Sequence, residues 1–321
     1  MLFIAAGAAG FALHRLTERY DRALTKQELL DPAARRDESG SWLRQHVSGS
    51  LNYLLVGTDR RPKDPGGGLA DTILIAHVPA GLKRAYLVSV PRDLLAEIPP
   101  DGPAGYPGGT DKINSAFLYG GGGAAGARLL SATLTGLTGL RFDGAAIINF
   151  GGFRKVIDLL GGVTICVDTE VRSIHTGAVF PVGCHQMGGA QALDYARQRY
   201  GLPGGDHDRE RHQQQILKAI MQKAGTGGLL ANPVRADQLI RALGSAMIVD
   251  TNRVPPANVA SALWSLRADA LVGLQVPTTG SVVDEIYSEQ LDPAADSLFA
   301  ALRGTDTESW VTANPRWVNR I

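Results

Sequence analysis

The segment between Thr72 and Val90 constrains the fold of this chain more than any other. It contains two β-branched apolar runs, TILIAHV (Thr72–Val78) and AYLVSV (Ala85–Val90), separated by a short turn, Pro79–Lys83. Such runs are typical of β-strands, and a turn this short predicts that they pair as an antiparallel hairpin. A sheet that contains this hairpin is mixed or antiparallel, not purely parallel.

Strand-like and helix-like segments alternate along the rest of the chain. Further strands are predicted at Leu51–Val56, Gly144–Phe150 and Val163–Val167. Helical spacing of apolar residues predicts helices at Phe153–Leu160, Ala190–Arg199 and Arg209–Ala224. The chain has 321 residues, of which 44% are apolar, enough for a sizeable core. We therefore expect an α/β protein, a three-layer α/β/α sandwich around a mixed, largely central sheet.

The two ends of the chain differ in composition from its middle. The apolar run MLFIAAGAAGFAL ends at His14 and is shorter than the ~20 residues of a full membrane span. It is either an amphipathic or buried first helix or the end of a longer anchor. We assign 1–16 to this segment, 17–48 to a charged linker, 49–303 to the main domain and 304–321 to a polar, loosely held tail.

The chain has two cysteines, Cys166 and Cys184, which flank one polar segment. They are either independent buried thiols or a disulfide that closes a short loop, and no CxxC spacing suggests metal ligation. A disulfide would indicate an oxidising, extracytoplasmic compartment, in agreement with a membrane anchor.

Two classes of ligand are not expected. The net charge is +1, and the arginines lie among acids and glutamines, so we expect no nucleic-acid partner. Gly121, Gly123 and Gly126 match G-x-G-x-x-G, but the preceding KINSAFLY is a poor strand and no acidic residue follows at the required distance. Dinucleotide binding is therefore not predicted either.

Three segments far apart in the sequence place charged residues at predicted element ends. They read GTDRRPKDPGGGLADT (Gly57–Thr72), SVPRD (Ser89–Asp93) and YARQRYGLPGGDHDRERHQQQ (Tyr195–Gln215). Two carboxylates, Asp59 and Asp71, suit a hard divalent cation such as Mg²⁺, with water and phosphate oxygens completing its coordination. Arginine forks bind phosphate oxygens. Together the segments predict a site for a metal-bound pyrophosphate.

Each of these residues also has a simpler interpretation when taken alone. Asp59 suits a turn and Asp71 the start of a strand. Arg197 and Arg199, at a helix carboxyl end, would interact favourably with the helix dipole and solvent.

The same segments, in the same order, resemble the LytR–CpsA–Psr family of bacterial cell-wall proteins. The matching pieces are LLVGTDRR, LADTILIAHV, YLVSVPRDLLAEIP, DKINSAFLYGG, INFGGFRKVIDLLGGVTICV, ALDYARQRY and GDHDRERHQQQILKAIMQKA. They form a motif core over 52–224, which leaves 225–303 as a C-terminal extension of the same catalytic domain. One departure is His212, where members often carry a second arginine before Gln213.

This resemblance implies an enzyme at the cell membrane with an extracytoplasmic catalytic domain. It would transfer a glycopolymer from a polyprenyl-pyrophosphate carrier to a peptidoglycan hydroxyl. The metal ligands would be Asp59 and Asp71, holding Mg²⁺, and the catalytic residues Asp71, Arg92 and Arg209. The implied pyrophosphate-binding residues are Arg61, Arg92, Lys112, Arg197, Arg199, Arg209 and Gln213.

The sequence leaves alternatives for the catalytic base, for the apolar residues and for the reaction itself. The base for the acceptor hydroxyl is Asp71 or Asp93, of which Asp71 is favoured for its place beside the metal. Small and branched apolar residues in Ser115–Phe153 either line a cavity for the polyprenyl tail or form ordinary core. The same site would also serve a pyrophosphatase, with water replacing the acceptor. A DNA-binding transcriptional attenuator is less expected, because the predicted helix Arg209–Ala224 is basic only in its first turn.

Overall fold

The computed structural model describes residues 24–36, 49–59, 68–226 and most of 241–321. Within the last range, 242–243, 245, 253, 255–262, 264–265 and 284 are not described. The apolar segment 1–16 and Arg61 therefore lie outside the described residues. None of the described helices has the length and hydropathy of a membrane span.

The centre of the molecule is an eight-stranded sheet with the order β1-β12-β7-β2-β3-β4-β13-β16. Its strands are β1 (Thr25–Lys26), β2 (Leu51–Thr58), β3 (Ala70–Val78), β4 (Ala85–Ser89), β7 (Gly144–Asn149), β12 (Met247–Asp250), β13 (Leu271–Gln275) and β16 (Val318–Asn319). The expected β3–β4 hairpin is confirmed as antiparallel, whereas β7 runs parallel to β2 and β13 parallel to β4. The sheet is mixed, as predicted.

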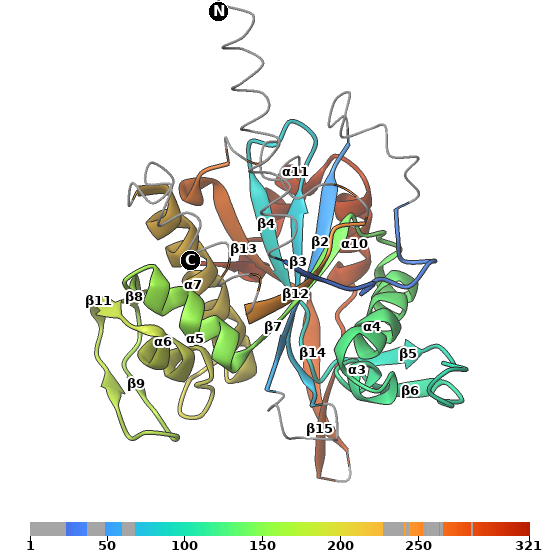
Figure 1. The fold of residues 1–321 in the computed structure, drawn as a ribbon, viewed down its shortest axis with the longest axis horizontal. Helices are drawn as coiled ribbons and strands as arrows, with labels where there is room; N and C mark the ends of the chain where they lie inside the picture. The colour runs from blue at the N-terminus through green and yellow to red at the C-terminus, as the bar shows by residue number, and fades with distance from the viewer. Residues whose placement is uncertain are drawn as a thin grey trace, which may run out of the picture.

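Helices cover both faces of this sheet (Figure 1). One face carries α3 (Ser115–Tyr119), α4 (Gly123–Thr138), α10 (Ala294–Arg303) and α11 (Thr307–Ala313), and the other α5 (Phe150–Leu159), α6 (Gly189–Ala196) and α7 (Asp206–Thr226). We call these the sealed side and the hollow side. Side chains along β2 alternate between the two faces of the sheet, which explains the layering. Leu54 and Val56 pack into the core of the sealed side, while Leu51 packs on the opposite face.

The hollow side has a core of its own, separate from the sheet. Side chains of α5, α6 and α7 pack there against β8 (Val163–Val167), with Ile157, Ile165, Tyr195 and Ile216 all buried. Gly189 allows the close contact between α6 and α5, because a Cβ there would lie 2.3 Å from the Arg154 carbonyl oxygen. The helices of this side therefore hold one another, and α7 also reaches the sheet, where Leu217 packs on its core and Gln214 donates to the Leu87 carbonyl at 2.8 Å.

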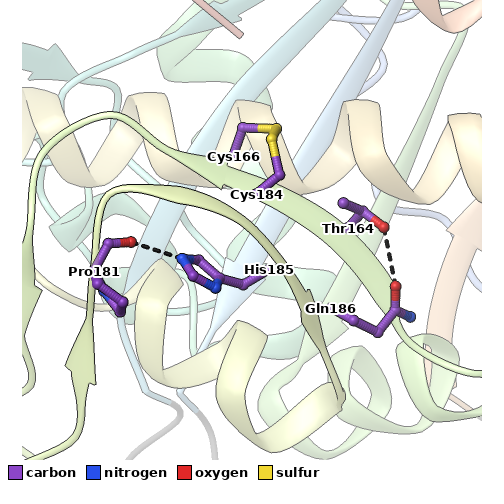
Figure 2. The surroundings of a disulfide bond; sticks show 6 residues. All are labelled: Thr164, Cys166, Pro181, Cys184, His185 and Gln186. Atoms are coloured by element: carbon purple, nitrogen blue, oxygen red, sulfur yellow. Dashed lines mark hydrogen bonds between the residues drawn. A yellow bond between two sulfur atoms is a disulfide. The ribbon is translucent and has the colours of Figure 1, made fainter.

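A disulfide braces the outer edge of this helical layer (Figure 2). Cys166 of β8 and Cys184 of β11 (Gly183–Met187) are directly paired residues of an antiparallel ribbon and are joined through their sulfur atoms. Between them the chain forms a second small ribbon, β9 (Val171–Arg172) with β10 (Val179–Phe180). Of the two sequence alternatives, the structure has the disulfide.

The remaining elements lie outside the central sheet. They are the pairs β5 (Leu95–Ile98) with β6 (Gly109–Lys112) and β14 (Thr278–Val283) with β15 (Ile286–Leu291), and the 3₁₀ turns Ala268–Ala270 and Pro315–Trp317. The β14–β15 hairpin continues from β13 and reaches the carboxyl end of β4, where the main-chain N–H of Glu289 donates to the Asp93 carbonyl at 3.0 Å.

Both ends of the described chain pack against the sheet, which corrects two expectations. In the segment 17–48, expected to be a linker, β1 pairs with β12, and Leu29 and Leu30 are fully buried. In 304–321, expected to be a loosely held tail, β16 pairs with β13 and Trp310 is 7% exposed. A few apolar side chains within polar segments are sufficient for this, because each buried Leu or Trp stabilises by roughly 1.5–3 kcal/mol.

Candidate functional site

A cavity of about 440 Å³ lies between the central sheet and the helices of the hollow side. Apolar side chains from β2, β3, β7, α5, α6 and α7 line most of it, including Leu55, Leu74, Ile148, Phe153, Leu193, Leu217 and Ile220. We refer to it as the central cavity. The cavity lies beside the contact that α7 makes with the sheet through Gln214.

The spacing of residues along α7 shows how one helix contributes both polar and apolar lining. Arg209, Gln213, Leu217 and Ile220 all line the central cavity and recur at intervals of three or four residues, which places them on one face of the helix. Arg209 lies in the first turn and the apolar pair further along. The cavity is therefore basic at one end and apolar beyond it.

Four arginines from three segments meet at this basic end, and we call them the arginine cluster. Arg92 follows β4, Arg197 caps the carboxyl end of α6, Arg199 comes two residues later, and Arg209 lies in the first turn of α7. All four line the central cavity. The guanidinium carbon of Arg197 lies 4.8 Å from the centre of the Phe150 ring, a cation–π contact that orients it.

Two carboxylates hold the arginine cluster together. Asp71 Oδ1 accepts from Arg92 Nη1 at 2.6 Å, and the Asp71 carbonyl accepts from Arg209 at 3.0 Å. Asp206 accepts from Arg209 at 2.8 Å and lies 3.7 Å from Arg92 and 3.9 Å from Arg199. The structure therefore brings together five residues that the sequence predicts to converge: Asp71, Arg92, Arg197, Arg199 and Arg209.

Burial lowers the pKa values of the two buried arginines, and neighbouring carboxylates raise them. Burial lowers the pKa of Arg209, an effect to which Arg92 adds and which Asp206 opposes. Burial alone would lower the pKa of Arg92 as well, but the charges of Asp206, Asp71 and Asp93 raise it. Both guanidinium groups remain charged at any ordinary pH. Arg209 is thus a buried cation with less compensating charge than Arg92, and an anion at the mouth of the cavity would stabilise it.

The other predicted residues are placed less centrally. Lys112, at the end of β6, pairs with Asp93 at 2.9 Å, and Asp93 also lies 3.7 Å from Arg92. Lys112 is thus joined to the arginine cluster through Asp93. Gln213 lines the cavity one turn after Arg209, and its side-chain amide donates to the Ala196 carbonyl at 3.4 Å.

The two acids proposed as metal ligands come from the same end of the β2–β3 hairpin. Thr58 pairs with Ala70 in antiparallel register, so Asp59 lies one residue beyond this pair towards the hairpin loop, and Asp71 lies on the strand side of it, where the register shifts. Gly57 is required there, because a Cβ would lie 2.8 Å from that of Thr72. Asp71 lines the cavity, whereas Asp59 is exposed.

The donor set at this end suits a magnesium ion that keeps water and phosphate ligands. Among the residues that the structure describes, no three His, Cys, Asp or Glu side chains are grouped as a metal site. Mg²⁺ is commonly held by only one or two carboxylates together with substrate phosphates, and Asp71, which lines the cavity, is a carboxylate of this kind.

One residue of the site, Asp206, was not identified from the sequence. It lies in the first turn of α7 and pairs with Arg209 three residues later. An acid at this spacing from an arginine on a predicted helix was the available signal. A second difference concerns Ser115–Phe153: its α3 and α4 residues, such as Phe117 and Leu130, pack into the sealed side. Only the segment from Ala146 to Phe153 lines the cavity.

Comparison with known proteins agrees with this architecture. The model of the LytR_cpsA_psr family matches residues 17–303. The chain is 33% identical over 217 residues to the probable cell wall biosynthesis protein LcpB of Corynebacterium glutamicum, covering 63% of this chain and 49% of that protein. It is 25% identical over 295 residues to the polyisoprenyl-teichoic acid–peptidoglycan teichoic acid transferase TagU of Bacillus subtilis, covering 90% and 87%.

A solved structure described as TagT bound to LI-WTA shares the fold, with a TM-score of 0.66, 20% identity and coverage of 87% of this chain and 98% of that one. The chain spans about half the length of the corynebacterial relative. The family match nevertheless extends over most of its residues and includes every part of the central cavity and the arginine cluster. This chain is a member of the LytR–CpsA–Psr family.

Proposed function

We propose that this chain is a phosphotransferase that attaches a glycopolymer from a polyprenyl-pyrophosphate carrier to peptidoglycan. The observation that carries the proposal is the composition of the central cavity, which is apolar along its length and lined by four arginines at one end. A polyprenyl chain needs a long apolar space, and a diphosphate needs several fixed cations. One cavity offers both.

In the proposed reaction the acceptor hydroxyl attacks the phosphorus that bears the glycopolymer. A new P–O bond to peptidoglycan forms, the phosphoanhydride bond breaks, and polyprenyl phosphate leaves. Arg92 and Arg209, already held by Asp71 and Asp206, would stabilise the charge that develops on the phosphate oxygens without rearrangement. Mg²⁺ bound at Asp59 and Asp71 would add further charge stabilisation.

The proton of the acceptor hydroxyl goes to a carboxylate in this proposal. Asp71 and Asp93 both remain candidates for the base: Asp71 pairs with Arg92, and Asp93 pairs with Lys112. Asp71 is favoured because it lines the central cavity.

The setting of the reaction is also part of the proposal. The Cys166–Cys184 disulfide supports an extracytoplasmic catalytic domain, because such bonds persist in oxidising compartments. Membrane attachment through residues 1–16 follows from the lipid-linked substrate, and the named activity of the TagU relative supports peptidoglycan as the acceptor.

The orientation of α7 does not favour a DNA-binding attenuator. Arg209 is 6% exposed, and His212 and Gln214 are fully buried, so the basic first turn faces the interior. A recognition helix must present such side chains to solvent and DNA.

The proposal is tested with the purified chain, Mg²⁺, a defined polyprenyl-pyrophosphate-linked oligosaccharide and peptidoglycan fragments, with products identified by mass. A conjugate that retains one phosphate is expected. Glycan phosphate and polyprenyl phosphate without a conjugate would instead identify a pyrophosphatase.

Two arginine variants provide the matched comparison. Arg209→Ala should lower transfer by about 10²–10³-fold, as for the loss of one preorganised cation beside a developing charge. Arg316→Ala removes an exposed ion pair with Asp292 on the sealed side and should leave transfer unchanged.

A further inference from the structure

A cluster of titratable side chains lies directly behind the arginine cluster, and none of its members lines the central cavity. His207 and Glu210 come from the first turns of α7, and Glu289 comes from β15. Glu210 and Glu289 are 3% and 1% exposed. Two glutamates so deeply buried are unusual, since buried carboxylates are normally paired or neutral.

His207 connects the two glutamates through its opposite ring nitrogens. Its Nδ1 lies 3.8 Å from Glu210, and its Nε2 lies 3.7 Å from Glu289. The Gln275 amide also contacts Nδ1. Because the two carboxylates approach different nitrogens, one metal ion could not be bound by all three side chains. Both separations exceed hydrogen-bonding distance, so His207 is coupled to the two carboxylates through charge, and protonation of one member affects the others.

The two glutamates differ in their hydrogen bonds. Glu289 accepts from Tyr287 at 2.9 Å and also from Thr278. Neither carboxylate oxygen of Glu210 has a hydrogen-bond partner. Burial raises the pKa of Glu210 to about 7, against the opposing effect of His207, so this side chain gains and loses its proton near neutrality. The His207 ring is 30% exposed and provides the path by which that proton reaches solvent.

The cluster is in contact with the machinery of the proposed site. Asp206, which holds Arg209 at 2.8 Å, directly precedes His207, and the Glu289 main chain bonds to Asp93. Despite burial of the ring, the charges of Glu210, Glu289 and Asp206 raise the pKa of His207. The charged and titratable groups that face the cluster are Asp206 and Arg209 of α7, Tyr287 of β15 and Asp93 after β4, while β13 and β14 contribute the neutral Gln275 and Thr278.

We propose that His207, Glu210 and Glu289 form a coupled titratable cluster that acts through Asp206 and Arg209 and makes the affinity of the arginine cluster for a diphosphate rise as the pH falls. The inference rests on the proposed function, because it requires that the arginine cluster binds a diphosphate. These three residues are positioning residues and do not touch the substrate.

The direction of this pH dependence follows from the charge of Glu210. Above the transition Glu210 is an anion directly after Arg209 in α7, and it repels an incoming diphosphate. Below the transition Glu210 is neutral, the repulsion is gone, and the arginine cluster keeps its full charge. One unit charge at this separation, in partly buried surroundings, changes affinity by about tenfold.

The experiment measures binding of a short-chain prenyl diphosphate sugar by calorimetry between pH 6 and 8.5 at constant Mg²⁺ and ionic strength. Both phosphates of this probe are esterified, so the probe has no proton that titrates in this range, and any pH dependence belongs to the protein. We expect the Kd of the wild-type chain to increase about tenfold from the acidic to the alkaline end.

Two variants separate positioning from simple loss of structure. Glu210→Gln keeps the shape of the side chain without its charge, and its Kd should stay near the acidic wild-type value throughout. Glu308→Gln, an exposed substitution on α11 where Glu308 pairs with Arg84, should retain the wild-type pH dependence. Circular dichroism and unfolding midpoints establish that both variants are folded.

The outcomes distinguish this inference from the proposed function. Absence of probe binding at every pH contradicts the proposed function. Tight binding that does not depend on pH, or a pH dependence that survives in Glu210→Gln, overturns the inference about the cluster while the proposed function stands.

Discussion

Helices cover both faces of the central sheet, but one face is closely packed and the other borders a cavity. On the sealed side, α3, α4, α10 and α11 pack directly onto the strands, and Phe117, Leu130 and Leu298 are fully buried. On the hollow side, α5, α6 and α7 pack mainly with β8 and with one another, α7 touches the sheet through Gln214, and a cavity of about 440 Å³ lies between the helices and β2, β3 and β7. The difference shows that close packing and an open cavity are divided between the two faces of one sheet.

The cavity of the hollow side lowers stability, and the separate core on that side offsets part of this loss. An apolar cavity forfeits dispersion contacts along its lining and invites collapse. The separate core around Tyr195 and Ile216, and the Cys166–Cys184 disulfide at its edge, keep the helical layer at its distance from the sheet. The sealed side needs no such brace because its helices rest on the strands.

Neighbouring alanines of β7 provide the sharpest test of this comparison. Ala146 lines the central cavity, and Ala145 is buried in the core of the sealed side. Ala146→Phe should fill the apolar end, leave the free energy of unfolding within about 1 kcal/mol of wild type, and lower transfer from long-chain donors on the order of 50-fold, the equivalent of about three displaced methylene groups. The measurement is transfer rate against donor chain length.

The matched variant, Ala145→Phe, should do the reverse. Inserting a ring into a close-packed core typically costs about 1–3 kcal/mol or more, so the unfolding midpoint should fall while preference among donors is unchanged. Equal destabilisation by the two substitutions would contradict the distinction between the sides.

Truncation of one phenylalanine on each side measures the packing difference directly. Phe117→Ala on α3 should lower the free energy of unfolding by about 3–5 kcal/mol, because it opens a new cavity in a core without space. Phe153→Ala on α5 should cost less, about 1–2 kcal/mol, because its side chain already borders the central cavity. Urea denaturation of both variants under the same conditions checks the order.

The disulfide should matter for the hollow side alone. Its cysteines are separated by 18 positions, for which loop-closure entropy suggests a contribution of about 3 kcal/mol. Cys166→Ala with Cys184→Ala should raise amide hydrogen exchange in β8 and α6 and leave the exchange of β3 and α4 unaltered. Reduction of the wild-type chain is the control and should reproduce this pattern; uniform loss of protection on both sides would contradict it.

The smallest effect concerns His212, which stacks on Tyr195 with ring centres 4.1 Å apart in the hollow-side core. Burial, with a contribution from Arg211, lowers the pKa of His212 to about 4. The unfolded chain therefore binds a proton between about pH 6.5 and 4 that the folded chain does not, and acid lowers stability by up to about 1.4 kcal/mol per pH unit.

Replacement of the imidazole by an apolar ring should remove this penalty. The free energy of unfolding of His212→Phe, relative to wild type, should increase as the pH is lowered from 6.5 towards 4, as measured by urea denaturation at several pH values. A difference that stays constant with pH would show that His212 is not held neutral.

The sequence was sufficient to predict the mixed sheet, the β3–β4 hairpin and the helices that precede and follow the arginines. These depend on local patterns: β-branched runs around a short turn, and apolar residues at helical spacing. The same patterns placed Asp71, Arg92 and Arg209 at element ends, and the family motifs linked them into one site. Asp206 is not predicted because its partners Arg92 and Arg199 are distant in sequence or separated by a loop, and its spacing from Arg209 is by itself only a common helical ion pair.

Only the tertiary structure decided which face of the sheet is hollow. Apolar residues recur at helical spacing in both α4 and α7, yet those of α4 fill the sealed core while Leu217 and Ile220 of α7 line the cavity. Likewise, Leu29 and Trp310 lie in polar segments that composition assigned to a linker and a tail, and both are buried. Periodicity along a chain determines which side of an element is apolar, but what that side meets depends on contacts between residues that are far apart in the sequence.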